Sequence, residues 1–326
     1  MADSQRILIV GGAGKTGQRL CETLQAAGHQ VSITTRQDPA TVMASLPAGV
    51  NAYQADPVAD AASFAHVIDH LGELDAVVSL MGAFLKNPHG VVFDGTRNVI
   101  APLRQRTKPI RYVFCSTIAV YGDRPNEVLT EESPLQLNQL VGQYHAEMEQ
   151  ELLAIGEPIH PIILRLPHIY GPGRERVFDL MRQGNFVIFG DGLNPMHHFY
   201  INDVVQVIVA AIDPTKPDGI YNAVEDIACP YRDYCDFVTD WCGVPRLANC
   251  TLEEALAGKL AEFLGPWMRN ESIVRELWAN MTARTVISNT KMKQQLGVYP
   301  QYPSLETGLT EMLQLENIPD RRLGVD

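Results

Sequence analysis

The sequence lacks the marks of proteins that bind nucleic acid or membranes. It holds 26 basic residues against 38 acidic ones, which gives a formal net charge of −12, and it has no run of lysine or arginine. Because nucleic acids and anionic membranes attract basic surfaces, we expect neither as a partner. No apolar stretch reaches the length that crosses a bilayer, and no signal peptide is expected, since a strand begins at residue 6. These absences predict a cytoplasmic protein.

The six cysteines lack the spacing of metal or redox sites. None of them forms a C-x-x-C pair, and no histidine stands near the last four. A zinc site is therefore not expected, and the thiols are interpreted as reduced and mostly buried. Repeats and low-complexity segments are absent as well. With 326 residues, 46% of them hydrophobic, the chain is long enough for one large α/β core and a smaller lobe.

A glycine-rich turn directly follows the first apolar run. The run 6–10 suits a buried strand, Gly11, Gly14 and Gly17 follow it, and an amphipathic segment over 18–27 comes next. Gly11 permits a tight turn, Gly14 lets the backbone approach a pyrophosphate, and Gly17 lets helix and strand pack closely. A helix start presents free N–H groups and a positive dipole to phosphates. This order of strand, turn and helix predicts a dinucleotide site.

Basic side chains near this turn favour NADP over NAD as the cofactor. Lys15 and Thr16 lie inside the glycine loop, and Arg36 ends the second expected strand, 30–35. In such folds an acid at that place binds the ribose 2′-hydroxyl of NAD, whereas an arginine accommodates the 2′-phosphate of NADP. The other interpretation is that Arg36 is a solvated loop residue.

Strands and helices alternate along the first two thirds of the chain. The expected strands cover 6–10, 30–35, 50–54, 74–80 and 110–115, and the expected helices cover 18–27, a segment from about 60, 91–106 and 137–154. This alternation predicts right-handed βαβ units, and therefore a Rossmann-type, doubly wound parallel sheet.

Further candidate residues stand at the ends of these strands, where such folds place ligands. Asp56 holds the adenine amino group or caps the next helix. Met81 and Gly82 let the chain pass close to a ribose. Ser116 and Thr117 supply hydroxyls that can donate to a substrate carbonyl.

Several motifs resemble the extended short-chain dehydrogenase/reductase family, the group of nucleotide-sugar epimerases and dehydratases. Besides the glycine loop they are Ser116-Thr117-x-x-x-Tyr121-Gly122, the segment from Arg165 to Gly173, Phe189-Gly190-Asp191-Gly192, the segment from Phe199 to Val204, and the segment from Asn289 to Gly297. The resemblance implies a nicotinamide cofactor, hydride transfer on a small-molecule substrate, and a possible homodimer through 91–106 and 137–154. The glycine loop and Arg36 look like those of atypical, NADP-binding members.

The Tyr-x-x-x-Lys pair that carries the chemistry of that family is missing. In one register Tyr144 is the tyrosine, and Met148 stands in place of the lysine. In the other, which we favour because of Ala146-Glu147, the pair becomes Gln139 and Gln143, and Gln143 lies beside the cofactor. Either way no lysine can lower the pKa of a phenol.

Other groups can move the proton in place of this pair. Tyr144 or His145 serves in the first register, and His168 follows the sixth strand, beside Pro167, which we assign to the cofactor site. Histidine is the commonest general acid or base, yet each of these side chains also has a purely structural interpretation. The remaining possibility is that Thr117 polarises the carbonyl while water delivers the proton.

The substrate segment departs from the family as well. His197-His198 stands where sugar-nucleotide members often carry Arg-Asp, and a neutral imidazole binds phosphate more weakly than a bidentate arginine. Arg174 and Arg176 can compensate, or they are solvated. Four aromatic residues and one methionine of the last third form either an apolar substrate pocket or, as we favour, ordinary core. They are Trp241, Phe263, Trp267, Met268 and Trp278.

The motif order divides the chain into two parts. We assign residues 1–166 and 199–224 to the nucleotide-binding domain, and 167–198 and 225–326 to the substrate lobe. The leading hypothesis is an NADP(H)-dependent oxidoreductase or epimerase/dehydratase-like enzyme that acts on a carbonyl or alcohol carbon. The alternatives are a non-catalytic NADP-binding sensor, and a non-redox isomerase or cyclase on the same fold.

Overall fold

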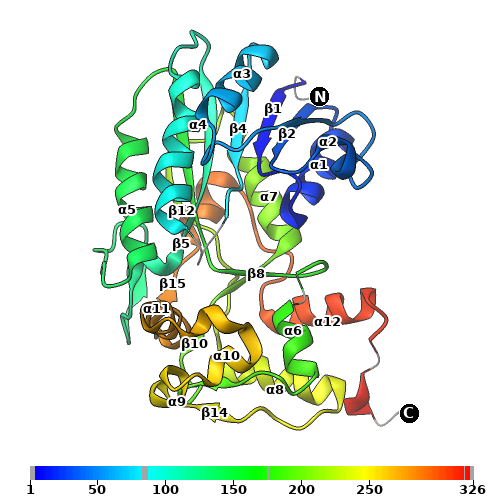
Figure 1. Cartoon of the computed structure of the whole chain (residues 1–326), viewed down its shortest axis with the longest axis vertical. Coiled ribbons are helices and arrows are strands. Elements are labelled where there is room, and N and C mark those ends of the chain that lie inside the picture. The colour runs from blue at the N-terminus through cyan, green and yellow to red at the C-terminus, as the bar shows by residue number, and fades with distance from the viewer. Residues whose placement is uncertain (1–3, 83–86, 175, 319, 324–326) are drawn as a thin grey trace.

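The computed structural model describes residues 4–82, 87–174, 176–318 and 320–323. A parallel sheet with its helices is stacked on a helical lobe, and β8 (His168–Tyr170) crosses between the two (Figure 1). The large sheet has seven strands in the order β12-β7-β5-β4-β1-β2-β3. They are β1 (Arg6–Val10), β2 (Gln30–Thr35), β3 (Asn51–Gln54), β4 (Ala76–Ser79), β5 (Ile110–Thr117), β7 (Ile159–Leu166) and β12 (Gly219–Asn222).

Every neighbouring pair in this sheet is parallel, so the expected Rossmann-type topology is confirmed. One face packs against α1 (Lys15–Ala26) and α7 (Ile201–Ala211). The other packs against α3 (Ala61–Leu71), α4 (Thr96–Leu103) and α5 (Leu140–Leu153). Burial on both faces explains why the central strands are almost continuously apolar. A short helix, α2 (Pro39–Met43), joins β2 to β3.

Most of the expected elements differ from the observed ones by a few residues at their ends, and two differences are important for the site. The expected helix 91–106 is a π-helical turn, η1 (Gly90–Gly95), followed by α4, which contains Pro102 and ends at Leu103. Strand β5 continues two residues beyond its expected end, and this places Ser116 and Thr117 at its carboxyl end. A 3-10 turn, η2 (Ile118–Tyr121), follows directly.

The lobe has a core of its own, which includes Phe189, Tyr231, Met268 and Leu309. Its elements are α6 (Arg176–Arg182), β9 (Ile188–Phe189), β10 (Pro195–Met196), β11 (His198–Tyr200), β13 (Cys229–Pro230), α8 (Tyr231–Cys242), β14 (Asn249–Cys250), α9 (Leu252–Leu256), α10 (Lys259–Leu264), η3 (Pro266–Arg269), α11 (Glu271–Thr282), α12 (Leu305–Leu315) and η5 (Arg321–Leu323). No helix of the described ranges is long and apolar enough to cross a bilayer.

Part of the C-terminal third packs on the sheet instead. The π-helical turn η4 (Met292–Leu296) lies against α7, and Met292 and Leu296 belong to the core around the sheet. β15 (Val286–Ile287) pairs with β6 (Val128–Leu129), which also belongs to the sheet half of the chain. The chain thus returns to the sheet a second time after residue 284, inside the range 225–326 that the sequence assigns to the lobe.

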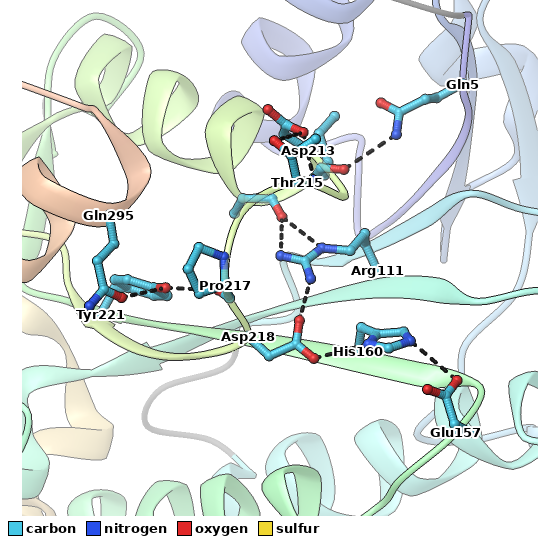
Figure 2. A network of polar contacts seen from close by, with 12 residues as sticks. Gln5, Arg111, Glu157, His160, Asp213, Thr215, Pro217, Asp218, Tyr221 and Gln295 are labelled. Carbon is cyan, nitrogen blue, oxygen red and sulfur yellow. Dashed lines mark hydrogen bonds and ion pairs between the residues drawn. The ribbon is translucent and has the colours of Figure 1, made fainter.

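A polar network ties the edge strand β12 to the amino ends of β5 and β7 (Figure 2). The buried Arg111 donates to Asp218 and to the carbonyl oxygen of Ala211, at the C-terminus of α7. Asp218 lies 3.0 Å from Nδ1 of His160, whose Nε2 lies 3.2 Å from Glu157. A cation at a helix C-terminus is favourable, so Arg111 holds α7 and the edge of the sheet together. The carboxyl ends of the strands remain for ligands.

Candidate active site

The glycine turn after β1 has the geometry of a dinucleotide cradle. Gly11 has a positive φ of 78°, and α1 begins at Lys15. A Cβ at Gly17 would lie 2.3 Å from the carbonyl oxygen of Gly12, so α1 packs against the turn more closely than any other residue allows. A Cβ at Gly14 would meet only the oxygen of Gly11, at 3.7 Å. The backbone at Gly14 is therefore open to a phosphate group.

A cleft of about 350 Å³ begins beside this turn. Its lining includes Gly11, Gly14, Thr35, Arg36, Asp56, Met81 and Gly82. Asp56 Oδ1 accepts from the backbone N–H of Val58 at 3.0 Å. The cap of α3 is Asp60, whose side chain accepts from Ser63. Lys15 is exposed and lies against Gly173, so among the described residues that line the cleft the cation is Arg36.

The cleft continues into a second one of about 510 Å³, because both share Met81 and Gly82. Thr16 lines its phosphate end, and Ser116, Thr117, His145 and Pro167 line its far end. The far end in turn opens on a cavity of about 540 Å³ in the lobe, since Thr117, Pro167 and Arg174 line both. Three hollows thus form one path, and Thr117 stands where the last two meet.

The walls of the lobe cavity are largely apolar. They include Leu180, Phe186, Phe189, Tyr231, Leu264, Trp267, Leu277 and Met281. Polar side chains also line the cavity, among them Gln139, His168, His197 and Thr285. The arrangement suits a ligand with an apolar chain and a polar group near Thr117.

A buried ion pair sets the rotation of α5 over β5 and β7. Glu149 and Arg165 are each 2% exposed, and the Arg165 guanidinium donates to both carboxylate oxygens, the shorter contact being 2.6 Å. Ser116 donates to the same carboxylate at 2.5 Å, and Arg165 also donates to the Tyr121 hydroxyl at 2.8 Å. The Ser116 hydroxyl is therefore turned toward this network.

One helical turn before Glu149, His145 lines the second cleft, of about 510 Å³, and Val141 lines the same cleft one turn earlier still. His145 Nδ1 lies 2.8 Å from the carbonyl oxygen of Val141, which assigns the proton to Nδ1 and leaves Nε2 as an acceptor. Burial lowers the pKa of His145, although its hydrogen bond to Val141 opposes the shift. A neutral imidazole therefore faces the cleft.

Residues 7–223 match the NAD dependent epimerase/dehydratase family. The chain belongs to this family. It is 26% identical to the 2-alkyl-3-oxoalkanoate reductase of Stenotrophomonas maltophilia, over 94% of this chain and 98% of that protein. The UDP-glucose 4-epimerase of Thermotoga maritima, solved with UDP-glucose, has a TM-score of 0.76 at 19% identity, over 96% of this chain and 98% of the other. A human epimerase family protein solved with NADPH has a TM-score of 0.72 at 18% identity, over 95% and 99%.

These findings bear out the Rossmann-type fold and the resemblance drawn from the motifs. The similar proteins include a reductase and epimerases, and solved structures of this fold hold NAD or NADPH. A nicotinamide cofactor and redox or epimerase-like chemistry are consistent with both findings.

The i, i+4 pair that faces the cleft differs from both registers considered for the epimerase/dehydratase motif. It is Val141 and His145, because Glu149 and Arg165 fix the helix. Gln143 instead donates to the carbonyl oxygen of Leu137 at 2.8 Å. Tyr144 packs edge-on against the rings of Phe93 and His89, which lie in or beside η1. Gln139 lines the lobe cavity from the N-cap of α5.

The two histidines in the Arg-Asp position of sugar-nucleotide epimerases do not form a phosphate site. His198 is fully buried, and Nε2 of His197 accepts from the backbone N–H of Ile287 at 2.9 Å. Burial lowers the pKa of His197 to about 4, and the neighbouring His198 adds to the effect. Both rings are therefore neutral near pH 7 and have little attraction for an anion.

Arg174 stands at the entrance from the cofactor path to the lobe cavity. Its guanidinium donates to the carbonyl oxygen of Ile169 and to the Thr16 hydroxyl, each at 3.2 Å. It thereby joins the segment after β8 to the glycine turn. The side chain of Arg176 lies outside the described part of the structure.

The large apolar residues singled out in the last third divide between core and cavity. Trp241 and Met268 are buried in the lobe core, whereas Trp267 lines the cavity and is 37% exposed. The core interpretation therefore holds for Trp241 and Met268, whereas Trp267 lines an apolar cavity, and the binding of a substrate there stays a prediction.

Proposed function

We propose that this protein is an NADP(H)-dependent oxidoreductase of a carbonyl compound with an apolar chain. The carrying observation is the place of Thr117, at the junction of a cofactor-sized path and an apolar cavity. The glycine cradle, the start of α1 and the strand ends fit a nicotinamide dinucleotide. When bound, such a cofactor supplies or accepts a hydride at the carbonyl carbon.

Arg36 supports NADP over NAD. It lines the adenosine end of the path, and β2 ends in Thr34 and Thr35, neither of which is acidic. A guanidinium there would hold a 2′-phosphate with charge-assisted hydrogen bonds.

Thr117 would polarise the substrate oxygen. Its hydroxyl oxygen accepts from the backbone N–H of Ala119 at 3.1 Å, which leaves the hydroxyl proton to donate into the cavity. His145 would accept from a ribose hydroxyl with Nε2, in the place where the family has its lysine. A preorganised donor at a developing oxyanion contributes a few kcal/mol to lowering the barrier.

The proposed substrate carries an acid group and an alkyl chain. The relative from Stenotrophomonas maltophilia is named for a 2-alkyl-3-oxoalkanoate, and the cavity here is walled by Leu, Phe, Trp and Met side chains. Arg174 lies at the same entrance as Thr117 and would bind the carboxylate.

Cofactor titration followed by turnover tests this proposal. We expect micromolar NADPH binding that weakens about tenfold in Arg36→Ala, with NADH much less affected. NADPH oxidation with 2-alkyl-3-oxo acids of increasing chain length should then favour long chains over UDP-sugars. Binding of neither cofactor, or turnover of UDP-sugars alone, contradicts the proposal.

The second candidate is a non-catalytic NADP-binding sensor, because Val141 cannot take the tyrosine's role. It predicts tight NADPH binding without oxidation by any carbonyl compound.

We further propose a cytoplasmic homodimer through α4 and α5. Leu137, Leu140 and Leu153, on or beside α5, are 40%, 49% and 48% exposed. Light scattering of the purified protein gives its mass, and a monomer contradicts the dimer.

A further inference from the structure

Two histidines face each other across the short strands that separate sheet and lobe. β8 and β11 pair in parallel, with His168 opposite His198, and the two ring centres lie 5.6 Å apart at 87°. His168 opens on the lobe cavity, while His198 is fully buried behind it. The pair of rings therefore connects the cavity wall with the buried interior.

Glu225 lies directly behind His198. Its Oε1 accepts from the His198 backbone N–H at 2.7 Å and lies 3.5 Å from Nδ1 of the same residue. Glu225 is 1% exposed. The charged groups that act on its carboxyl group are two other acids, Asp203 and Asp226. Burial, together with these like charges, raises the pKa of Glu225 to about 9, against the opposing hydrogen bond from His198. Tyr170 and Cys229 also face it.

Polar atoms without partners gather in this cluster. Within the described residues, both ring nitrogens of His198 and Oε2 of Glu225 lack a hydrogen bond. Such buried groups cost stability, and a cluster of them calls for a functional explanation. It is no metal site, since the described chain holds no group of three metal-ligating side chains.

We propose that Glu225, His198 and His168 form a proton relay that serves the substrate oxygen at the lobe cavity. The relay rests on the proposed carbonyl reduction, and it supplies the proton that the absent tyrosine does not. His168 is the catalytic residue, because it lines the cavity; His198 and Glu225 act through it.

The relay conserves charge and atoms. When the carbonyl carbon gains a hydride from the reduced nicotinamide, the C=O π pair moves to oxygen, and the oxygen takes a proton from a ring nitrogen of His168. The other nitrogen of His168 takes a proton from His198, whose Nδ1 takes one from Oε1 of the Glu225 carboxyl. For these two transfers the rings, whose centres lie 5.6 Å apart, and the 3.5 Å contact between Nδ1 and Oε1 must each close to hydrogen-bond distance. Both imidazoles end neutral, the product is an alcohol, and Glu225 is left as a carboxylate that regains its proton from water.

Infrared spectroscopy tests the starting state without any turnover. We expect the difference spectrum between wild type and Glu225→Gln, near pH 7 in D₂O, to show the C=O band of a protonated carboxyl group. The matched control is Glu253→Gln, which removes an exposed carboxylate and should show carboxylate bands only. Carboxylate bands in the Glu225 difference would mean a buried ion pair with His198 and would overturn the relay.

Histidine NMR tests the coupling, again without substrate. In wild type the ring ¹⁵N shifts of His168 should change as Glu225 ionises at alkaline pH, and this change should vanish in Glu225→Gln. His198→Phe should abolish it too, while keeping the ring contacts with Tyr170 and Tyr234. An alkaline transition that persists in both variants contradicts the relay.

Turnover separates this inference from the proposed function. With a 2-alkyl-3-oxo acid, His198→Phe and Glu225→Gln should each lower kcat about tenfold to a hundredfold and leave NADPH affinity unchanged. Unchanged kcat in folded variants contradicts the relay alone. Absence of turnover in wild type contradicts the proposed function, whereas the spectroscopic results on the pair still stand.

Discussion

At the scale of single residues, Thr117 is the side chain on which the proposed chemistry depends most. Thr117→Val removes the hydroxyl and keeps the shape, and we expect kcat to fall about a hundredfold, as for loss of one oxyanion donor. NADPH affinity should stay the same, because in the proposed reaction the hydroxyl would donate to the substrate oxygen and not to the cofactor. Steady-state kinetics check this, with Thr117→Ser as the control that retains the donor. Equal kcat in Thr117→Val and wild type would remove Thr117 from the mechanism.

Arg165 supports the same site through structure. Arg165→Met leaves Glu149 buried without its partner, and we expect a loss of about 3 kcal/mol in the free energy of unfolding. The exposed pair Arg97–Glu151 is the control, and Arg97→Ala should cost under about 1 kcal/mol. Urea titrations measure both. Equal losses in the two variants would contradict a structural role for the buried pair.

At the scale of elements, the glycine turn offers a separation of folding from binding. Gly17→Ala places a Cβ 2.3 Å from the Gly12 oxygen, so α1 must move away from the turn, and we expect a loss of about 2 kcal/mol. Gly14→Ala meets no such contact and should unfold like wild type, yet it should weaken NADPH binding, because the Cβ would stand where the proposed pyrophosphate approaches the backbone. Thermal unfolding and fluorescence titration check the two effects. If each variant lost both stability and NADPH affinity to the same extent, the separation of folding from binding would be contradicted.

Elements with a local pattern could be predicted, and the rotation of α5 could not. β1 and β2 match their expected bounds because a buried apolar run and a glycine turn are adjacent in sequence. The face of α5 depends on Arg165, which meets Glu149 only after β7 has paired with β5. Ala146-Glu147 resembles the family's Ala-Glu, but the register that it suggests, Gln139 and Gln143, lies two residues before the pair that faces the cleft. The one available signal was Arg165, a charge inside an apolar strand that requires a buried acid.

At the scale of the whole molecule, and for a similar reason, the sequence offered an apolar pocket in the lobe only as the less favoured of two interpretations. Its walls come from segments as far apart as Thr117 and Ile287, and no local spacing reports how well they pack. Composition favoured ordinary core for the aromatic residues, and most of them do form core. The unfilled volume is a property of the assembled lobe, and so is the burial of His197 and His198 between lobe and sheet.

Because these histidines are buried, the free energy of unfolding should depend on pH. The folded pKa of His197, about 4, lies below its ordinary value of about 6.5, so the unfolded chain binds the proton first as pH falls. Its contribution is complete above pH 6.5 and is lost toward pH 4, by about 2 kcal/mol between pH 7 and 5. The pKa of Glu225 is raised in the folded state, so its contribution to stability grows as pH falls and offsets the stability that His198 loses. We therefore expect His197→Gln to be less stable at pH 7 but to lose about 2 kcal/mol less than wild type on acidification to pH 5. Urea titrations at the two pH values measure this, and an equal acid loss in both proteins would show that His197 is not the group that titrates.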